Sequence, residues 1–203
     1  MHTVVCFVAR QPGFRCLTEL TRDPNFQVKA VFSHQKKPSS EDRSRSIRED
    51  YQDFRNFCEE RNIPFFIKDT FGAAAVLNEI SALLPFDFLF SCNWKFKIPL
   101  NDLKMARIAA INLHRGKLPD YRGLEPILRA LKDGQKRIFL SAHHMEKEYD
   151  TGALIAELSI PANHDLGRPI ELEVERLKEE LFPFYPKIMF TAFEKIIESG
   201  KTK

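Results

Sequence analysis

Along the first half of the chain, short apolar runs alternate with longer stretches in which apolar and polar residues are mixed. Five apolar runs predict strands: Thr3–Ala9, Val28–Ser33, Ile63–Lys68, Phe86–Ser91 and Arg107–His114. Their composition is typical of strands buried on both faces of a parallel sheet. The stretches between them predict helices over Phe14–Leu20, residues 51–61 and Ala73–Leu84. Strand–helix–strand units repeating at about 30 residues predict an α/β fold with a doubly wound, mostly parallel sheet.

Two segments interrupt this pattern. We expect Pro12-Gly13 to break the chain before the first helix, because both residues disfavour helix interiors. Residues 34–50 are charged and rich in serine, which predicts a surface loop that leads into the second helix.

The second half of the chain follows a different pattern. Residues 137–145 and 152–160 predict two longer strands, which we expect to form an antiparallel pair. Residues 168–198 predict a terminal helix with a bend near Pro183 or Pro186. We expect its apolar residues to face the core, and a homodimer surface is the alternative. These residues are Phe182, Phe184, Met189 and Phe193. No repeat or linker divides the sequence, so we expect one domain over residues 1–203.

Composition narrows the class of protein. The 203 residues are 43% hydrophobic and 29% charged, and the net charge of +3 is too small to predict a nucleic-acid partner. The four cysteines form no Cys-x-x-Cys pair, which indicates free thiols in a reducing compartment. The N-terminus lacks the features of a signal peptide, and no apolar run approaches the roughly 20 residues of a membrane span. We expect a cytoplasmic protein with no membrane partner.

Several common sites are absent from the sequence. The stretch after the first strand, ARQPGFR, has one glycine, so it is neither a dinucleotide-binding loop nor a P-loop. No Gly-x-Ser-x-Gly motif is present. His2, His34 and His164 are expected to be ordinary core or surface residues. A metal site formed by His114, His143 and His144 is an alternative, but no cysteine or acidic ligand lies beside them at a metal-site spacing, so we expect no metal.

An amide and an imidazole stand together at the end of the fifth predicted strand. Asn112 and His114 are two residues apart, so their side chains point to the same face of an extended strand. An Asn amide can donate to a developing oxyanion, and a carboxylate beside an imidazole can orient it. With no serine or cysteine in the motif, the pair favours direct attack of an amine or water on a carbonyl. A structural role for the pair is the alternative.

The same residues resemble the formyltransferases that use 10-formyltetrahydrofolate. The family signature Asn-x-His-x-x-x-Leu-Pro-x-x-x-Gly is matched by the stretch from Asn112 to Gly123. A family Asp-x-Gly, seven residues after a histidine, is matched by His143 and Asp150-Thr151-Gly152. The resemblance covers most of the chain and implies the Rossmann-like formyltransferase fold.

The resemblance implies a catalytic trio of Asn112, His114 and Asp150, and direct passage of formyl from the folate to a primary amine. It implies that 10-formyltetrahydrofolate is the cosubstrate and that no metal takes part. Residues expected to bind the folate are Trp94, Lys95, Phe96, Lys97, Ile98, Glu146 and Lys147. Core packing is the alternative for Trp94 and Phe96. Supporting roles are expected for His143, Gly123 and Gly152.

Departures from the family pattern concern the substrate. After His114 this chain has Arg-Gly-Lys where many members have Pro-Ser-Leu, so Arg115 and Lys117, with Arg10, are the substrate-binding candidates. The chain lacks the loop by which glycinamide ribonucleotide enzymes bind phosphate, and we expect no C-terminal barrel of the kind that methionyl-tRNA formyltransferases carry. We therefore expect the formyl acceptor to be a small, anionic amine, and an amino-sugar nucleotide is our first choice. Glycinamide ribonucleotide, hydrolysis of the formyl-folate and a catalytically silent binding protein are the alternatives.

Overall fold

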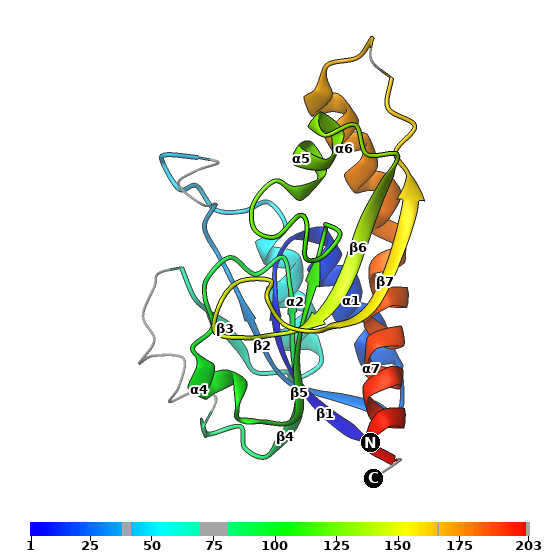
Figure 1. The fold of residues 1–203 in the computed structure, drawn as a ribbon. Helices are drawn as coiled ribbons and strands as arrows, with labels where there is room; N and C mark the ends of the chain where they lie inside the picture. The colour runs from blue at the N-terminus through cyan, green and yellow to red at the C-terminus, as the bar shows by residue number, and fades with distance from the viewer. Residues whose placement is uncertain (38–41, 70–80, 166, 202–203) are drawn as a thin grey trace. The chain divides into compact units, whose positions relative to one another are not determined.

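A computed structural model of the protein describes residues 1–37, 42–69, 81–165 and 167–201. The chain divides into two compact units, Met1–Ala110 and Ile111–Lys203. Each unit is described by itself below, and both are drawn in Figure 1. In the described ranges, no helix has both the length and the apolar composition that a membrane crossing requires.

The first unit is built on parallel strands. They are β1 (His2–Val8), β2 (Phe26–Ser33), β3 (Phe65–Ile67) and β4 (Phe86–Cys92), in the order β3-β2-β1-β4. Every residue of β4 is buried, as its apolar sequence predicts. The Phe7 and Phe32 rings stack with centroids 4.6 Å apart and are both fully buried. Because the strands are parallel, the residues that follow β1, β2 and β4 lie at one edge of the sheet, where ligands bind in folds of this kind.

The first helix differs from its prediction. Helix α1 spans Arg10–Arg22, so it begins four residues before Phe14 and includes Pro12 and Gly13. The expected break at Pro12-Gly13 is therefore wrong. Pro12 occupies the third position of the helix, where a backbone N–H has no partner within the helix, so the ring costs no hydrogen bond.

The rest of the first unit follows the sequence pattern more closely. Helix α2 spans Tyr51–Glu60, as predicted, and buries Tyr51, Phe54 and Cys58. A short helix α4, Leu100–Leu103, was not predicted. Most of the helix expected over Ala73–Leu84 lies outside the described residues, as do residues 38–41 of the 34–50 segment.

The second unit begins within a strand. Strand β5 (Ala106–His114) pairs antiparallel with β6 (Arg137–His144), which pairs antiparallel with β7 (Leu154–Pro161). The helices are α5 (Pro126–Lys132), α6 (Ile170–Leu181) and α7 (Tyr185–Lys201), with the 3-10 turn η1 (Phe182–Phe184) before α7. Figure 1 shows α7 running beside β6 and β7, which it contacts. The predicted bend is confirmed, because η1 contains Pro183.

The apolar positions of the terminal helices are mostly in the core. Met189 and Phe193 are fully buried, whereas Phe182 and Phe184 are half-buried. All four cysteines are free and buried. The strand order β3-β2-β1-β4-β5-β6-β7, parallel on one side and antiparallel at the C-terminal end, confirms the predicted α/β class with its terminal helix.

Candidate active site

The end of β5 presents two polar side chains to one carboxylate. The Asn112 amide nitrogen lies 3.4 Å from Oδ1 of Asp150, and Nδ1 of His114 lies 3.3 Å from Oδ2 of the same residue. Their two-residue spacing on an extended strand explains why both face Asp150. The structure therefore brings together the three residues that the sequence singled out.

Asp150 is fixed by its own loop and by a second one. It lies after β6 with a φ of 54°, in the left-handed region that non-glycine residues rarely adopt. The Gly123 N–H donates to its Oδ2 at 2.9 Å, and Nε of Arg122 donates to its backbone carbonyl at 3.0 Å. The side chain is 10% exposed. A strained residue held from several directions is typical of a functional position.

Both nitrogens of the His114 ring have partners. Nε2 lies 2.6 Å from the backbone carbonyl of Tyr121, which can only accept, so Nε2 carries the hydrogen. The Nδ1 lone pair is then directed toward Asp150. Burial lowers the pKa of His114, while the Asp150 charge and the Tyr121 carbonyl oppose that shift. The ring is neutral near pH 7, with a carboxylate placed to stabilise its protonated form.

His143 completes the cluster. Its Nδ1 lies 2.7 Å from the backbone carbonyl of His144, and its Nε2 lies 3.1 Å from the Asn112 amide nitrogen. Nε2 also lies 3.3 Å from Oδ1 of Asp150. Burial alone would raise the pKa of Asp150, but His143, His114 and the Gly123 N–H together hold that pKa below its usual value. Asp150 is therefore ionised at neutral pH.

Of the two glycines predicted to support the site, Gly123 has a φ of 78°, which a residue with a side chain adopts only with strain. At Gly152 a β-carbon would lie 1.9 Å from the backbone carbonyl of His144. A side chain there would push the turn that carries Asp150 away from β6. Both glycines therefore hold Asp150 in position.

Four other predicted residues of this unit lie at or near the surface. Lys117 forms an exposed ion pair with Asp120 at 3.1 Å, which fits a solvated surface. Arg115 is half-buried, and its charge contributes to lowering the pKa of His114. Glu146 and Lys147 are exposed on the turn after β6.

In the first unit, the segment predicted to bind the folate packs into an aromatic cluster. The Trp94 ring stacks on His34 at 4.1 Å, and Phe7 contacts it edge-on at 5.1 Å. Phe96 meets His34 edge-on at 4.8 Å. These contacts agree with the packing interpretation of Trp94 and Phe96, and Ile98 is buried. Nε1 of Trp94 is buried without a hydrogen-bond partner among the described residues.

His34 is part of this cluster, and its ring is fully hydrogen-bonded to the backbone. Nδ1 donates to the Lys68 carbonyl at 2.7 Å, and Nε2 accepts the Lys95 N–H at 3.3 Å. Burial, with a contribution from Arg48, lowers the pKa of His34 to about 4. This is the satisfied core histidine that the sequence predicts.

Arg10 lines a separate cavity in the first unit. The cavity has a volume of about 450 Å³ and is lined by Arg10, Gln11, Lys37, Glu49, Asp50 and Asp53. Arg10 has a φ of 63°, so the first residue of α1 is strained. Lys37 pairs with Glu49 at 3.4 Å. Cations and carboxylates therefore line the same cavity at the start of two helices.

Sequence reasoning missed two contributors to the site. The Tyr121 carbonyl is a backbone group that any residue supplies, so only the Tyr-Arg-Gly turn in the motif hinted at it. Arg129 holds that turn by donating to the carbonyls of Arg122 and Leu124. No spacing in the sequence singles it out.

Comparison with known proteins places the chain among formyl transferases. The family model described as formyl transferase matches residues 1–182. Methionyl-tRNA formyltransferase of Latilactobacillus sakei subsp. sakei (strain 23K) is 35% identical over 108 residues, which are 52% of this chain and 34% of that protein. The chain thus matches about a third of the length of this curated relative.

Solved structures share the fold at low identity. Glycinamide ribonucleotide transformylase 1 from Symbiobacterium toebii has a TM-score of 0.71 and 18% identity, covering 96% of this chain and 89% of that one. A formyltetrahydrofolate deformylase from Pseudomonas syringae pv. tomato str. DC3000 has a TM-score of 0.72 and 16% identity, covering 95% and 59%. These two neighbours support the fold, and the family model identifies the lineage: the chain belongs to the formyl transferase family.

Proposed function

We propose that the protein is an N-formyltransferase that moves a formyl group from 10-formyltetrahydrofolate to a primary amine of a small, anionic molecule. The observation that carries this proposal is the convergence of Asn112 and His114 on the Asp150 carboxylate at 3.4 and 3.3 Å. Membership of the formyl transferase family supports it. No metal enters the proposal, and we place the protein in the cytoplasm.

The reaction is an acyl transfer without a covalent enzyme intermediate. The amine nitrogen attacks the formyl carbon, and the carbonyl oxygen gains negative charge. The bond from the formyl carbon to N10 then breaks, and the proton lost by the amine goes to N10. The products are the formamide and tetrahydrofolate.

Asn112 is proposed to stabilise the oxyanion. Its amide nitrogen lies 3.1 Å from Nε2 of His143 and donates to Asp150 at 3.4 Å. The bond to Asp150 is the one that the formyl oxygen would replace as it gains charge. A donor held in place in this way lowers the activation barrier of acyl transfer by about 3 kcal/mol.

His114 is proposed to act as the base. Its hydrogen is held on Nε2 by the Tyr121 carbonyl, so Nδ1 takes the proton released by the amine. Asp150, 3.3 Å away, stabilises the positive ring. Because burial holds the pKa of His114 below its usual value, the base stays available down to mildly acidic pH.

The folate is proposed to contact residues from Trp94 to Ile98, together with Glu146 and Lys147. The unpartnered Nε1 of Trp94 supports this assignment, because a pterin presents ring nitrogens and a carbonyl that accept such a donor.

An amino-sugar nucleotide remains our first choice of acceptor, with Arg10, Arg115 and Lys117 as its binding residues. The cavity that Arg10 lines supports this choice by its chemistry. Its cations suit phosphate oxygens, and its carboxylates accept hydrogen bonds from sugar hydroxyls. An amino-sugar nucleotide carries both groups.

An amine-dependence assay tests the function. The protein is given 10-formyltetrahydrofolate with a panel of amino-sugar nucleotides, with glycinamide ribonucleotide, or with no amine, and tetrahydrofolate and formate are measured. We expect turnover that requires an amino-sugar nucleotide. Formate release without an amine would indicate a hydrolase, and turnover with glycinamide ribonucleotide alone would reassign the acceptor. No turnover under any condition would favour a silent binding protein.

Variants of the trio test the mechanism. Asn112→Ala and Asp150→Ala should each lower kcat at least about 100-fold while the protein stays folded. Asn56→Ala, which removes an exposed amide on α2, is the matched control and should keep full activity. Full activity in both trio variants would refute the mechanism.

A further inference from the structure

Two backbone groups of the segment Tyr121–Leu124 contact the proposed catalytic pair. The Tyr121 carbonyl accepts from Nε2 of His114 at 2.6 Å, and the Gly123 N–H donates to Oδ2 of Asp150 at 2.9 Å. These contacts set the hydrogen position on His114 and help to keep Asp150 ionised. Their geometry depends on where the segment lies.

The segment has no regular secondary structure to hold it. It precedes α5 and includes Gly123, with a φ of 78°. The next residue after the segment, Glu125, has a φ of 50°. Tyr121 is buried and its hydroxyl donates to Asp133 at 3.1 Å, but Leu124 is 89% exposed, so apolar burial anchors only the first residue of the segment. Irregular backbone needs hydrogen-bond partners for its polar groups, so the partners of the segment's carbonyls help to hold it in place.

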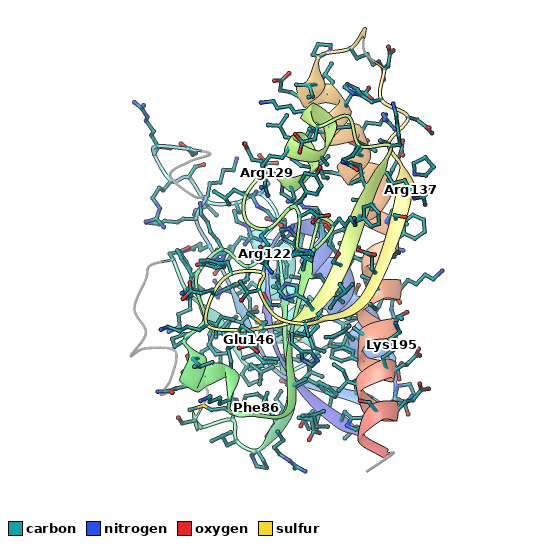
Figure 2. All side chains as sticks on the ribbon, viewed as in Figure 1. Phe86, Arg122, Arg129, Arg137, Glu146 and Lys195 are labelled. Carbon is teal, nitrogen blue, oxygen red and sulfur yellow. The ribbon has the colours of Figure 1, made fainter. Side chains whose placement is uncertain are left out.

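One side chain from α5 supplies those partners. Nε of Arg129 donates to the Leu124 carbonyl at 3.1 Å, and Nη2 donates to the Arg122 carbonyl. These carbonyls lie on either side of Gly123. The guanidinium carbon also lies 5.8 Å from the centroid of the Tyr121 ring. Figure 2 labels Arg129 beside α5 and Arg122 on the loop that follows β5.

We propose that Arg129 is a positioning residue for formyl transfer, which clamps the segment Tyr121–Leu124 so that its carbonyl and its N–H hold His114 and Asp150. This inference rests on the proposed function. Arg129 acts through the segment and touches neither reacting group. A planar guanidinium suits the role because it donates in two fixed directions at once, which a lysine ammonium does not.

The test combines kinetics with the titration of His114. Arg129→Gln should lower kcat at least about tenfold, with a smaller change in KM for the folate, because misplacement of catalytic groups acts on the chemical step. In the free protein, the His114 ring signal, assigned by its loss in His114→Gln, should titrate at lower pH once the Tyr121 carbonyl no longer supports the protonated ring. Arg129→Lys should give intermediate values of both.

Arg137→Gln is the matched control. Arg137 also makes two hydrogen bonds, to the hydroxyl and the carbonyl of Ser159 at 2.8 and 3.0 Å, but these join β6 to β7. We expect wild-type kcat and a wild-type His114 titration from it. If Arg129→Gln does not fold, Arg129→Lys carries the test.

An unchanged His114 titration in the Arg129 variants would overturn the clamp, whatever happens to kcat. The titration needs no substrate. A protein that fails to transfer formyl to any amine therefore leaves the clamp testable, and the two failures are distinguishable.

Discussion

Two buried histidines, one in each unit, have opposite surroundings. His34 follows β2 and has backbone partners on both ring nitrogens, and burial lowers its pKa to about 4. His114 ends β5 and is as deeply buried, at 8% exposure against 6% for His34. Its Nδ1, however, faces a carboxylate.

The difference shows that burial alone does not make a catalytic histidine. A ring whose nitrogens are both bound to backbone resists protonation, because gaining a proton would break the bond at Nε2. A ring beside an ionised aspartate can gain a proton and have the charge stabilised. The carboxylate partner, rather than the depth of burial, distinguishes the proposed base from the structural residue.

The largest effect expected from this comparison is on catalysis. His114→Gln should lower kcat at least about 100-fold, the usual contribution of a general base, with little loss of stability. His34→Gln should lower stability rather than kcat, because it removes a packed ring and leaves the trio intact. Steady-state kinetics and denaturant unfolding of both variants check this. Equal losses of kcat would contradict the distinction.

The next effect is on the pH dependence of stability. The unfolded chain binds a proton at His34 near pH 6.5, whereas the folded protein does so only at about pH 4. The neutral His34 ring therefore makes its full contribution to the free energy of unfolding above pH 6.5, and this contribution is lost as the pH falls toward 4. Between about pH 7.5 and pH 5, wild type should lose about 2 kcal/mol that His34→Phe does not lose.

Urea unfolding at the two pH values measures this difference. Other titrating groups contribute equally to both proteins, so the comparison isolates His34. Phe14→Leu, in a different aromatic cluster with Phe54 and Phe57, is the control and should cost the same at both pH values. A parallel pH dependence of wild type and His34→Phe would show that His34 titrates normally.

The smallest expected effect is on stability, and it concerns glycines in the unit that contains His114. Gly123 and Gly134 both have positive φ, 78° and 70°, with open space where a side chain would point. Alanine at either position should cost about 1 kcal/mol of stability. Only Gly123 contacts Asp150, so only Gly123→Ala should also lower kcat. Thermal unfolding and kinetics of the pair check this, and equal kcat values would argue against a role for the Gly123 N–H.

Much of the fold could be predicted from the pattern of apolar and polar residues. Strands such as β4 are predicted to within a residue, because an apolar run between polar segments leaves few alternatives. Helix α1 was misjudged at its start, since Pro12 is harmful only beyond the first turn. Helix α5, seven residues long and preceded by the left-handed Glu125, has too little periodicity to predict.

The site was predictable where side chains carry the chemistry. Asn112 and His114 stand out by type and spacing, the family resemblance adds Asp150, and the structure brings the three together with His143. Gly123 was predicted as a supporting residue, but the Tyr121 carbonyl was not predictable, because backbone groups are the same at every position. Arg129 was missed for a related reason, since its partners are carbonyls that only the folded loop places within reach.

The antiparallel register of β5 limits which mutations the strand can accept during evolution. Ile111 and Leu113 pair with His144 and Ala142, while Asn112 and His114 pair with His143 and Ser141. Deleting one residue upstream in β5 would exchange the two sets and turn the amide and the imidazole to the opposite face. Heritable variation in this strand is therefore confined to substitutions, and any lengthening or shortening must be accommodated in the loops outside it.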